Sequence, residues 1–260
     1  MIIIRLLYRK IKMVYGRLNY FRWRKLRFHG AFSTYEDAVA YAKRKNISVG
    51  FNHDKVANIH FDIMSQVVPW DYPVLFWLEK LLPDTKSIID LGGHMGTKYR
   101  AFKPYLKFDI NHHRWIIYDL PAIIAAGRKQ AIADGLNELV FIDHINIDET
   151  HDIAIASGLL QYLDIPLSIL ISHFPVPPKH LILNKVAMRD GDNVVTIENI
   201  EVSLNPYQIR NRKLFIDELL GIGYEIVDEW EIPSLSHMIP THPELGRSKS
   251  FGFYCKLNDK

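Results

Sequence analysis

Residues 86–97 read KSIIDLGGHMGT, and the fold that we expect depends on this stretch. Residues 87–89 form a short apolar run with β-branched side chains, which is typical of a buried parallel strand. Asp90 ends the run, and it is followed by three glycines, Gly92, Gly93 and Gly96. Glycine has no Cβ, so the chain can turn tightly there and lie close to a ligand. A helix that begins after Gly96 would direct its free N–H groups and its dipole toward that ligand. The pattern predicts the ligand-binding turn of an α/β domain.

The spacing of the glycines favours one class of ligand. A dinucleotide-binding turn has the pattern G-x-G-x-x-G, and Leu91 stands where the first glycine of that pattern would be. The stretch is better described as D-x-G-G-x-x-G, with a carboxylate at the end of the strand. This carboxylate suits a ligand with a cation or with hydroxyl donors, such as S-adenosylmethionine (SAM), better than it suits a pyrophosphate. The structural alternative is a glycine turn that only reverses the chain.

A second apolar run that ends in a carboxylate supports this prediction. Residues 115–119 read WIIYD, and Leu120 and Pro121 follow. We expect Asp119 and Leu120 to lie at the cofactor. Pro121 suits the first turn of a helix, and Gly135 suits the position after its last turn. The carboxylate of Asp119 offers two acceptor oxygens, which can bind both ribose hydroxyls of an adenosyl group. NAD and SAM both contain that group, so Asp119 does not separate them. A solvated loop carboxylate is the alternative.

The composition is that of a globular domain. Of the 260 residues, 48% are hydrophobic and 23% are charged, which is enough for one full domain with a small extension. The single cysteine, Cys255, excludes an internal disulfide framework, and we predict no metal site. No apolar run is long enough to cross a membrane, and the first residues lack the pattern of a secretory signal. We therefore expect a cytoplasmic protein.

The N-terminal segment is basic, with no acidic residue before Glu36. Aliphatic and aromatic side chains are interspersed with its arginines and lysines. Three roles stay open: a peripheral arm on the inner face of an anionic membrane, a helix that packs on the main domain, and contact with a nucleic acid backbone. Nucleic acid is the weakest of the three, because no aromatic RNA-binding motif follows. We place this arm and a helical cap at residues 1–83, and the α/β domain at residues 84–260.

Other patterns complete the expected order of elements. A capping box at Ser33 and Glu36 predicts a helix that ends near Lys45, and further helices are expected at about 53–67, 73–83 and 206–220. Strands are expected at 139–143, 152–156, 180–184, 224–230 and 250–256. Because ligands bind beyond the carboxyl ends of parallel strands, we expect the residues that follow two of these strands at the same site, namely Asp143, Ser157 and Gly158.

The chain resembles a family of SAM-dependent methyltransferases found with bacterial surface-polysaccharide genes. The resemblance covers most of the chain from about Phe28, and an ordered set of stretches carries it: IIDLGGHMGTKYR, WIIYDLPAIIAAGR, DIAIASGLLQYL, and LILNKV with VTIENI. It implies a Rossmann-like class I methyltransferase fold, an α/β fold with seven mostly parallel strands and helices on both faces. It also implies that SAM binds at Asp90, Gly92, Gly93, Gly96 and Asp119.

The chain departs from this family at two positions. Members often have glutamate where this chain has Asp119, and the shorter acid should still reach a ribose. They also tend to have an arginine after the fifth strand, where this chain has Asn184 and Lys185. The missing arginine leaves open how an acceptor would be bound there.

The leading hypothesis for function is methyl transfer from SAM to a sugar hydroxyl of a surface glycan or its precursor. Such a transfer depends mainly on the alignment of donor and acceptor, and a general base helps when the acceptor is a hydroxyl. Two alternatives stay open. One is an NAD-dependent oxidoreductase, and the other is a non-catalytic protein of the same fold that acts as a partner or membrane-docking subunit.

Several side chains are candidates for contact with the acceptor. His94 is the first candidate for the general base, because it lies in the glycine turn. The other candidates for the base are Asp143, His144 and His173. Candidates for binding an anionic or sugar acceptor are Tyr99, Lys185 and Tyr207. Each of these side chains has a purely structural alternative role in a loop, on the surface or in the core.

Overall fold

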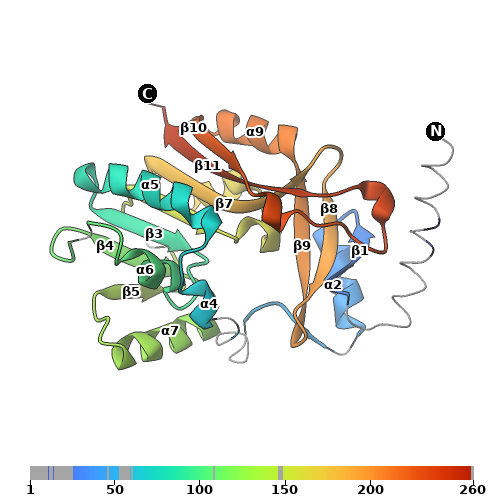
Figure 1. Ribbon diagram of the computed structural model, residues 1–260, viewed down its shortest axis with the longest axis horizontal. Coiled ribbons are helices and arrows are strands. Elements are labelled where there is room, and N and C mark those ends of the chain that lie inside the picture. The colour runs from blue at the N-terminus through green and yellow to red at the C-terminus, as the bar shows by residue number, and fades with distance from the viewer. Residues whose placement is uncertain are drawn as a thin grey trace.

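The structure is a computed structural model, shown in Figure 1. It describes residues 26–45, 47–52, 61–107, 109–145 and 149–258, together with residues 11, 14 and 59. The basic arm lies almost entirely outside the described residues, and so do residues 53–58 and 60 of the helix expected at about 53–67; in the rest of that range the α-helix covers only Phe61–Met64. In the described part of the chain, every helix is too short or too polar to span a lipid bilayer.

The elements follow one another along the chain in a mixed order of strands and helices. They are β1 (Phe28–Phe32), α2 (Tyr35–Lys43), β2 (Ser48–Val49), α4 (Phe61–Met64), the 3₁₀ helix η1 (Pro69–Asp71), α5 (Tyr72–Leu81), β3 (Ser87–Leu91), α6 (Thr97–Phe102), β4 (Arg114–Tyr118), α7 (Pro121–Ala133), β5 (Leu139–Ile142), β6 (Ile153–Ser157), the 3₁₀ helix η3 (Leu160–Tyr162), α8 (Leu167–Ser172), β7 (His180–Arg189), β8 (Val194–Asn199), β9 (Ser203–Asn211), α9 (Arg212–Gly221), β10 (Tyr224–Glu231) and β11 (Lys249–Leu257).

A largely parallel sheet forms the centre of the molecule. Strands β5, β4, β3, β6 and β7 lie side by side in that order, and every neighbouring pair is parallel. Strand β11 then pairs antiparallel with β7, and β10 pairs antiparallel with β11. These strands correspond to the seven predicted from the sequence. The glycine turn follows the carboxyl end of β3 at the centre of this arrangement (Figure 1).

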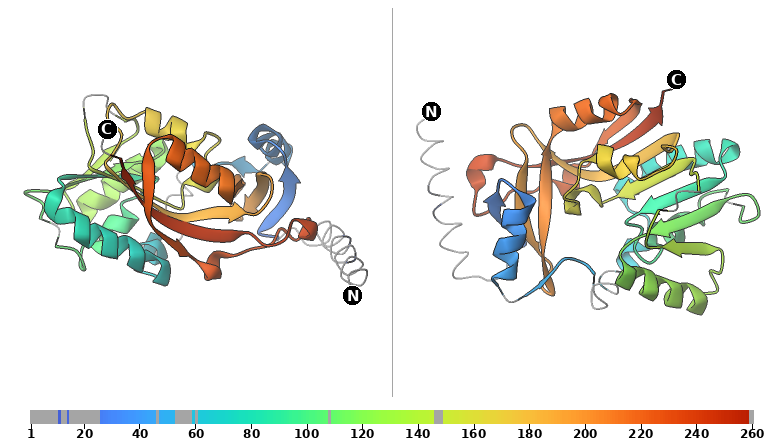
Figure 2. Two further views of the ribbon diagram at one scale, coloured as in Figure 1. Left: turned by 90° about the horizontal axis from the view of Figure 1, so that it is seen from above. Right: turned by 180° about the vertical axis from the view of Figure 1, so that it is seen from behind.

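Helices cover both faces of the sheet, because successive side chains of a strand point to opposite faces. Ile89 and Leu91 of β3 share a buried cluster with side chains of α8 and α9. Ile88 belongs to the opposite cluster, which α5, α6 and α7 supply. The views from two further directions in Figure 2 show these two helical layers with the sheet between them. Both faces of the central strands are therefore dry, as their apolar composition predicts.

The sheet is larger than expected, since it contains eleven strands within the described residues. The end of β7 pairs with β9, β9 pairs with β8, and β8 pairs with β1. The short strand β2 also pairs with β9. Strands β1 and β2 were not predicted from the sequence, and they lie in the segment assigned to the arm and cap. The boundary that we drew between 1–83 and 84–260 thus crosses one continuous sheet.

Two local predictions were wrong in their details. The helix expected from residue 206 begins only at Arg212, because Ser203–Asn211 is strand β9, whose hydrogen-bonding partner is β8. The Asn211 side chain then accepts the N–H of Leu214 at 2.9 Å and caps the helix. The cap of α2 is Thr34 instead of Ser33, and its hydroxyl accepts the N–H of Asp37 at 3.1 Å.

Candidate functional site

The glycine turn after β3 has the backbone that its sequence predicts. Gly92 and Gly96 have φ angles of 67° and 76°, in the left-handed region that favours glycine. A Cβ added at Gly93 would lie 2.8 Å from the Cγ of Asp90, so only glycine lets the turn pass this closely over that carboxyl group. Helix α6 then starts at Thr97. The turn therefore closes tightly over the end of β3.

Asp90 lies beneath this turn and is 1% exposed. Burial raises the pKa of its carboxyl group to about 7, and the negative charge of Asp119 acts in the same direction. A hydrogen bond from Trp115 and the nearby cations Lys98 and Lys185 lower the pKa but only in part offset the burial. A bound cation would favour the ionised form of this carboxyl group. Asp90 is therefore suited to a positively charged ligand.

Asp119 is half-buried and joins the glycine turn to the next strand. Its Oδ2 accepts the backbone N–H of His94 at 2.8 Å, and its Oδ1 accepts the backbone N–H of Leu120 at 2.7 Å. Burial raises the pKa of this carboxyl group, although both hydrogen bonds oppose the shift. Each carboxylate oxygen has two lone pairs, so one remains on each for the hydroxyls of a ligand. Asp119 therefore contacts the glycine turn through the N–H of His94.

The end of β6 reaches the same place. Gly158 follows β6 with a φ of 85°, and its N–H donates to the backbone oxygen of Asn184 at 2.8 Å. A Cβ added at Gly92 would lie 2.9 Å from Cδ1 of Leu159, so the segment after Ser157 contacts the glycine turn. The structure thus brings the ends of β3, β4 and β6 together, as expected for a ligand site in an α/β sheet.

Other predicted residues lie farther from this centre or act through their backbone. His94 has a left-handed backbone with φ of 56°, and the contact that joins it to Asp119 comes from its N–H group. Leu120 is 41% exposed. Asp143 is exposed after the edge strand β5, and its Oδ1 lies 2.9 Å from Nδ1 of His144, a contact that lowers its pKa. Roles for Asp143 in cofactor binding and for His94 in catalysis stay predictions.

A buried ion pair that was not predicted from the sequence lies beside the turn. The Nζ of Lys98 lies 2.9 Å and 2.7 Å from the two carboxylate oxygens of Asp71, and the side chains are 9% and 0% exposed. Lys98 is the second residue of α6, and Asp71 is the last residue of η1. The available signal was the position of Lys98 itself, a lysine directly after the glycine turn. The pair fixes the segment before α5 against the site.

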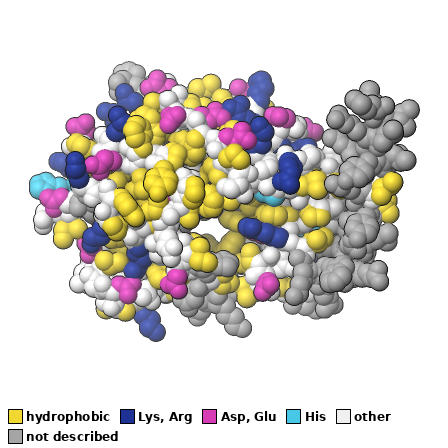
Figure 3. Space-filling model, in the orientation of Figure 1, with side chains coloured by type: hydrophobic (Ala, Val, Ile, Leu, Met, Phe, Trp, Pro, Cys, Tyr) yellow, Lys and Arg dark blue, Asp and Glu magenta, His cyan; other side chains and the backbone are white. Residues whose placement is uncertain are grey.

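The surface is hollowed where these strands end. Figure 3 shows a hollow near the middle of the face, between the half that carries α5 and α6 and the half that carries β8 and β9. The carboxyl ends of the parallel strands are directed toward it in the same orientation in Figure 1. Within the described residues, no three His, Cys, Asp or Glu side chains are grouped as ligands for a metal ion. The hollow is therefore the candidate site for cofactor and acceptor.

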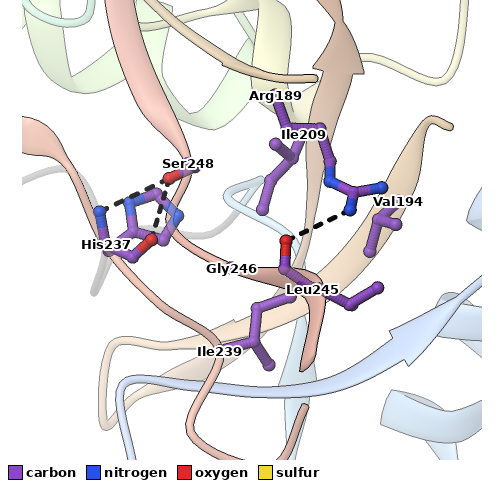
Figure 4. Close-up of a pocket in the computed structure, with 8 residues that line it drawn as sticks. All are labelled: Arg189, Val194, Ile209, His237, Ile239, Leu245, Gly246 and Ser248. Carbon is purple, nitrogen blue, oxygen red and sulfur yellow. Dashed lines mark hydrogen bonds between the residues drawn. The ribbon is translucent and has the colours of Figure 1, made fainter. Parts of the chain in front are cut away.

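A separate small pocket lies between β9 and the loop before β11. Figure 4 shows Arg189 directed at this loop, where its Nη2 donates to the backbone oxygen of Leu245 at 3.1 Å. The Ser248 hydroxyl donates to the backbone oxygen of His237 at 3.1 Å. These polar groups bind the loop itself, which fits a structural role better than ligand binding.

Comparison with known proteins identifies the fold. No family model and no curated protein sequence matches the chain. Among solved structures, the N-terminal domain of EvdMO1, determined in the presence of SAH (S-adenosylhomocysteine) and D-fucose, has a TM-score of 0.52 and 10% identity, over 74% of this chain and 84% of that one. An O-methyltransferase family protein from Burkholderia thailandensis has a TM-score of 0.51 and 15% identity, over 96% of this chain and 72% of that one. OxaC has a TM-score of 0.51 and 15% identity over 79% of this chain, which spans only 52% of OxaC. The chain has the Rossmann-like fold of class I methyltransferases.

Proposed function

We propose that this chain is a SAM-dependent methyltransferase that methylates a hydroxyl group of a sugar, in a surface glycan or its precursor. The observation that carries the proposal is the meeting of two carboxylates at one glycine turn. Asp90 lies under Gly93, and Asp119 accepts the N–H of His94 in the same turn. An adenosyl ligand with a positively charged end needs one carboxylate near its charge and another near its ribose hydroxyls. Asp90 and Asp119 would supply these two carboxylates.

The residues of the turn fit SAM in charge and in hydrogen bonding. The raised pKa of Asp90, about 7, fits a positively charged ligand, since such a ligand would favour the ionised carboxylate. The free lone pairs of Asp119 fit the two ribose hydroxyls. SAM would supply a methyl group activated by a sulfonium. The chain would supply alignment, which can be worth on the order of 7 kcal/mol in well-oriented reactions.

The NAD alternative has less support from the turn. Leu91 is the last residue of β3, and its side chain is 0% exposed in the core. A dinucleotide-binding turn has a glycine at this position, because the chain must turn tightly there at the end of the strand. The position of Leu91 thus favours the adenosyl sulfonium over the dinucleotide.

Two observations support a sugar acceptor. The chain resembles methyltransferases found with surface-polysaccharide genes, and EvdMO1, whose N-terminal domain was solved with D-fucose, shares its fold. A sugar hydroxyl is a weak nucleophile, so the site would need a base as well as alignment. The basic N-terminal segment would hold such an enzyme at the inner face of an anionic membrane.

Isothermal titration calorimetry with SAH tests the cofactor site. We expect the wild-type chain to bind SAH, and Asp119→Ala to weaken binding by about 10- to 100-fold, the usual worth of hydrogen bonds to a charged group. Asp217→Ala, on the surface of α9, is the matched control and should bind as the wild type does. Absence of SAH binding by the wild-type chain would contradict the proposed cofactor.

Labelled methyl donor tests the acceptor. The wild-type chain is incubated with methyl-labelled SAM and a bacterial envelope extract, and the labelled products are identified by mass spectrometry. We expect label on a sugar oxygen. Label on protein, lipid or nucleic acid alone would contradict the sugar acceptor, while SAH binding would still support the cofactor.

A further inference from the structure

Lys185 has an unusual backbone at a bulge in β7. Phe251 of β11 pairs with Val186 and Phe253 pairs with Leu183, so Gly252 alone faces the two residues between them. Lys185 has a φ of 61°, in the left-handed region that residues with a Cβ rarely adopt. Such an outlier persists only where the surrounding structure holds it, and it often marks a functional site.

The bulge directs the lysine to the carboxyl end of the neighbouring strand. The parallel pairing of β6 with β7 ends where Ser157 faces Asn184. A Cβ added at Gly158 would lie 3.0 Å from both Cε and Nζ of Lys185, so the amine lies directly across this glycine. The missing side chain at Gly158 makes room for the amine. The strained bulge within β7 and the glycine after β6 together place the amine where the charge of Asp90 acts on it.

The charges around this amine leave it weakly basic. Burial and the cation of Lys98 on α6 lower the pKa of Lys185 to about 8, while Asp71 on η1 and Asp90 on β3 act in the opposite direction. Asp71 is already bound to Lys98, and the pKa of Asp90 is itself raised to about 7. In the part of the chain that the structure describes, no hydrogen bond or ion pair ends on Nζ of Lys185. A substantial fraction of this amine is therefore neutral near physiological pH, with a lone pair that can accept a proton.

We propose that Lys185 is the general base of methyl transfer, and that its neutral Nζ takes the proton of the acceptor hydroxyl. The inference rests on the proposed function. The O–H bond breaks and its proton passes to Nζ, the oxygen forms the new bond to the methyl carbon, and the electron pair of the broken C–S bond stays on sulfur in a neutral thioether. The Lys185 ammonium then returns its proton to water. Lys185 thus takes the role for which His94 was the first candidate.

The first test measures the amine itself and needs no acceptor. The full chain is acetylated with acetic anhydride over a range of pH, and peptide mass spectrometry follows each lysine. We expect the labelling of Lys185 to rise with a midpoint near pH 8, at least about one unit below exposed lysines as a class. Saturating SAH should slow labelling of Lys185 and leave that of Lys213 on α9 unchanged. An ordinary midpoint for Lys185 would overturn the proposal.

The second test separates a base from a cation that only binds the acceptor. Lys185→Gly suits the left-handed backbone, and we expect it to bind SAH as the wild type does but to lose about 100-fold or more in methyl transfer to the envelope extract. Lys185→Arg should be equally impaired, because a guanidinium keeps its proton. Near-normal transfer by Lys185→Arg would overturn the proposal and make this side chain an anion contact.

The results can separate a failure of the role proposed for Lys185 from a failure of the proposed methyltransferase function. If the wild-type chain fails to bind SAH, the proposed function fails, and the inference fails with it. If SAH binds but Lys185 has the reactivity of an exposed lysine, only the inference fails. The wild-type rate of transfer should also rise with pH up to about 8 and then level off, whereas a purely structural role would leave no such profile.

Discussion

Asp90 and Asp119 follow the same pattern in the sequence, yet their surroundings in the fold differ. Asp90 faces Trp115 in a dry layer beneath the glycine turn, whereas Asp119 accepts two backbone N–H groups at the mouth of the site. Two acids at the ends of neighbouring strands thus have different properties. Burial raises the pKa of Asp90, whereas Asp119 orders the turn through the two N–H groups that it accepts and keeps a lone pair on each oxygen.

The raised pKa of Asp90 predicts a dependence of stability on pH. The pKa is about 7 in the fold against an ordinary value of 3.8, so the folded chain holds this proton more tightly than the unfolded chain does. The stability due to the neutral carboxyl is fully present below pH 4 and is lost as pH rises through about 7. Asparagine stays neutral at every pH. We therefore expect the free energy of unfolding of Asp90→Asn, measured relative to that of the wild type, to rise by about 2 to 3 kcal/mol from pH 5 to pH 8. Urea unfolding of both proteins at the two pH values measures this, and a constant difference would show that the carboxyl is ionised throughout.

The strained backbone at Lys185 predicts that replacing this residue by glycine stabilises the fold. A left-handed backbone costs a residue with a Cβ about 1 to 2 kcal/mol, and glycine avoids this cost but has more entropy to lose. We expect Lys185→Gly to raise the free energy of unfolding by about 1 kcal/mol, whereas Lys185→Ala keeps its Cβ and should not relieve this strain. Glu201→Gly, at an exposed residue with φ of 71°, is the matched control. It should stabilise similarly and leave methyl transfer unchanged, and a loss of stability in Lys185→Gly would contradict the strain.

At the scale of elements, the bulge of β7 depends on the strand that faces it. Trp230 of β10 lies over Gly252 of β11, and its Nε1 donates to Oδ1 of Asn184 at 3.1 Å. The amide of Asn184 donates in turn to the backbone oxygen of Trp70 at 3.1 Å. The indole therefore holds the first residue of the bulge and leaves its second residue, Lys185, to face Gly158.

Gly252→Ala tests this arrangement. Its Cβ would lie 2.1 Å from Cε2 of Trp230, so the indole must move and its hydrogen bond to Asn184 must break. We expect a loss of about 2 kcal/mol or more in thermal or urea unfolding. Gly221→Ala is the matched control, because nothing lies within 4 Å of its Cβ position at the exposed end of α9. That change should be neutral or slightly stabilising, and equal effects of the two variants would contradict the role of Trp230.

The elements that could be predicted are those whose signals are local. Strands β3 and β4 and the turn between them follow from apolar runs that end in Asp90 and Asp119. Strand β9 could not be predicted, because its extended form depends on pairing with β8 and its own residues contain Pro206. Strand β1 pairs with residues about 170 positions away, and its short stretch has no period of its own. The parts of the site in which a carboxylate ends a strand could be predicted. The contribution of Asp71 and the bulge at Lys185 could not, because both depend on contacts between elements that are far apart in the sequence.

At the scale of the whole molecule, one strand joins the class I sheet to its extension. The first half of β7 pairs with β6, and its last residues pair with β9. A buried polar contact adds a second connection, because Tyr162 of η3 donates to Oε2 of Glu198 on β8 at 2.6 Å. Arg27 donates to the other oxygen of Glu198 at 2.9 Å and 3.0 Å, and Glu198 is 2% exposed. These connections predict that the extension and the core unfold together.

Tyr162→Phe tests whether the two parts form one cooperative unit. The change removes one hydrogen bond to a buried carboxylate, so we expect a loss of about 2 kcal/mol and a fall in Tm of roughly 4 to 8 °C for a chain of this size. Far-UV circular dichroism and tryptophan fluorescence should report one shared transition in the wild type and in the variant, because β7 runs through both parts. Tyr105→Phe, at a tyrosine that is 66% exposed, should change stability by less than about 0.5 kcal/mol. The alternative outcome is two separate transitions, of which Tyr162→Phe shifts only one. It would mean that β1, β8 and β9 unfold independently of the methyltransferase sheet, although β7 runs through both parts.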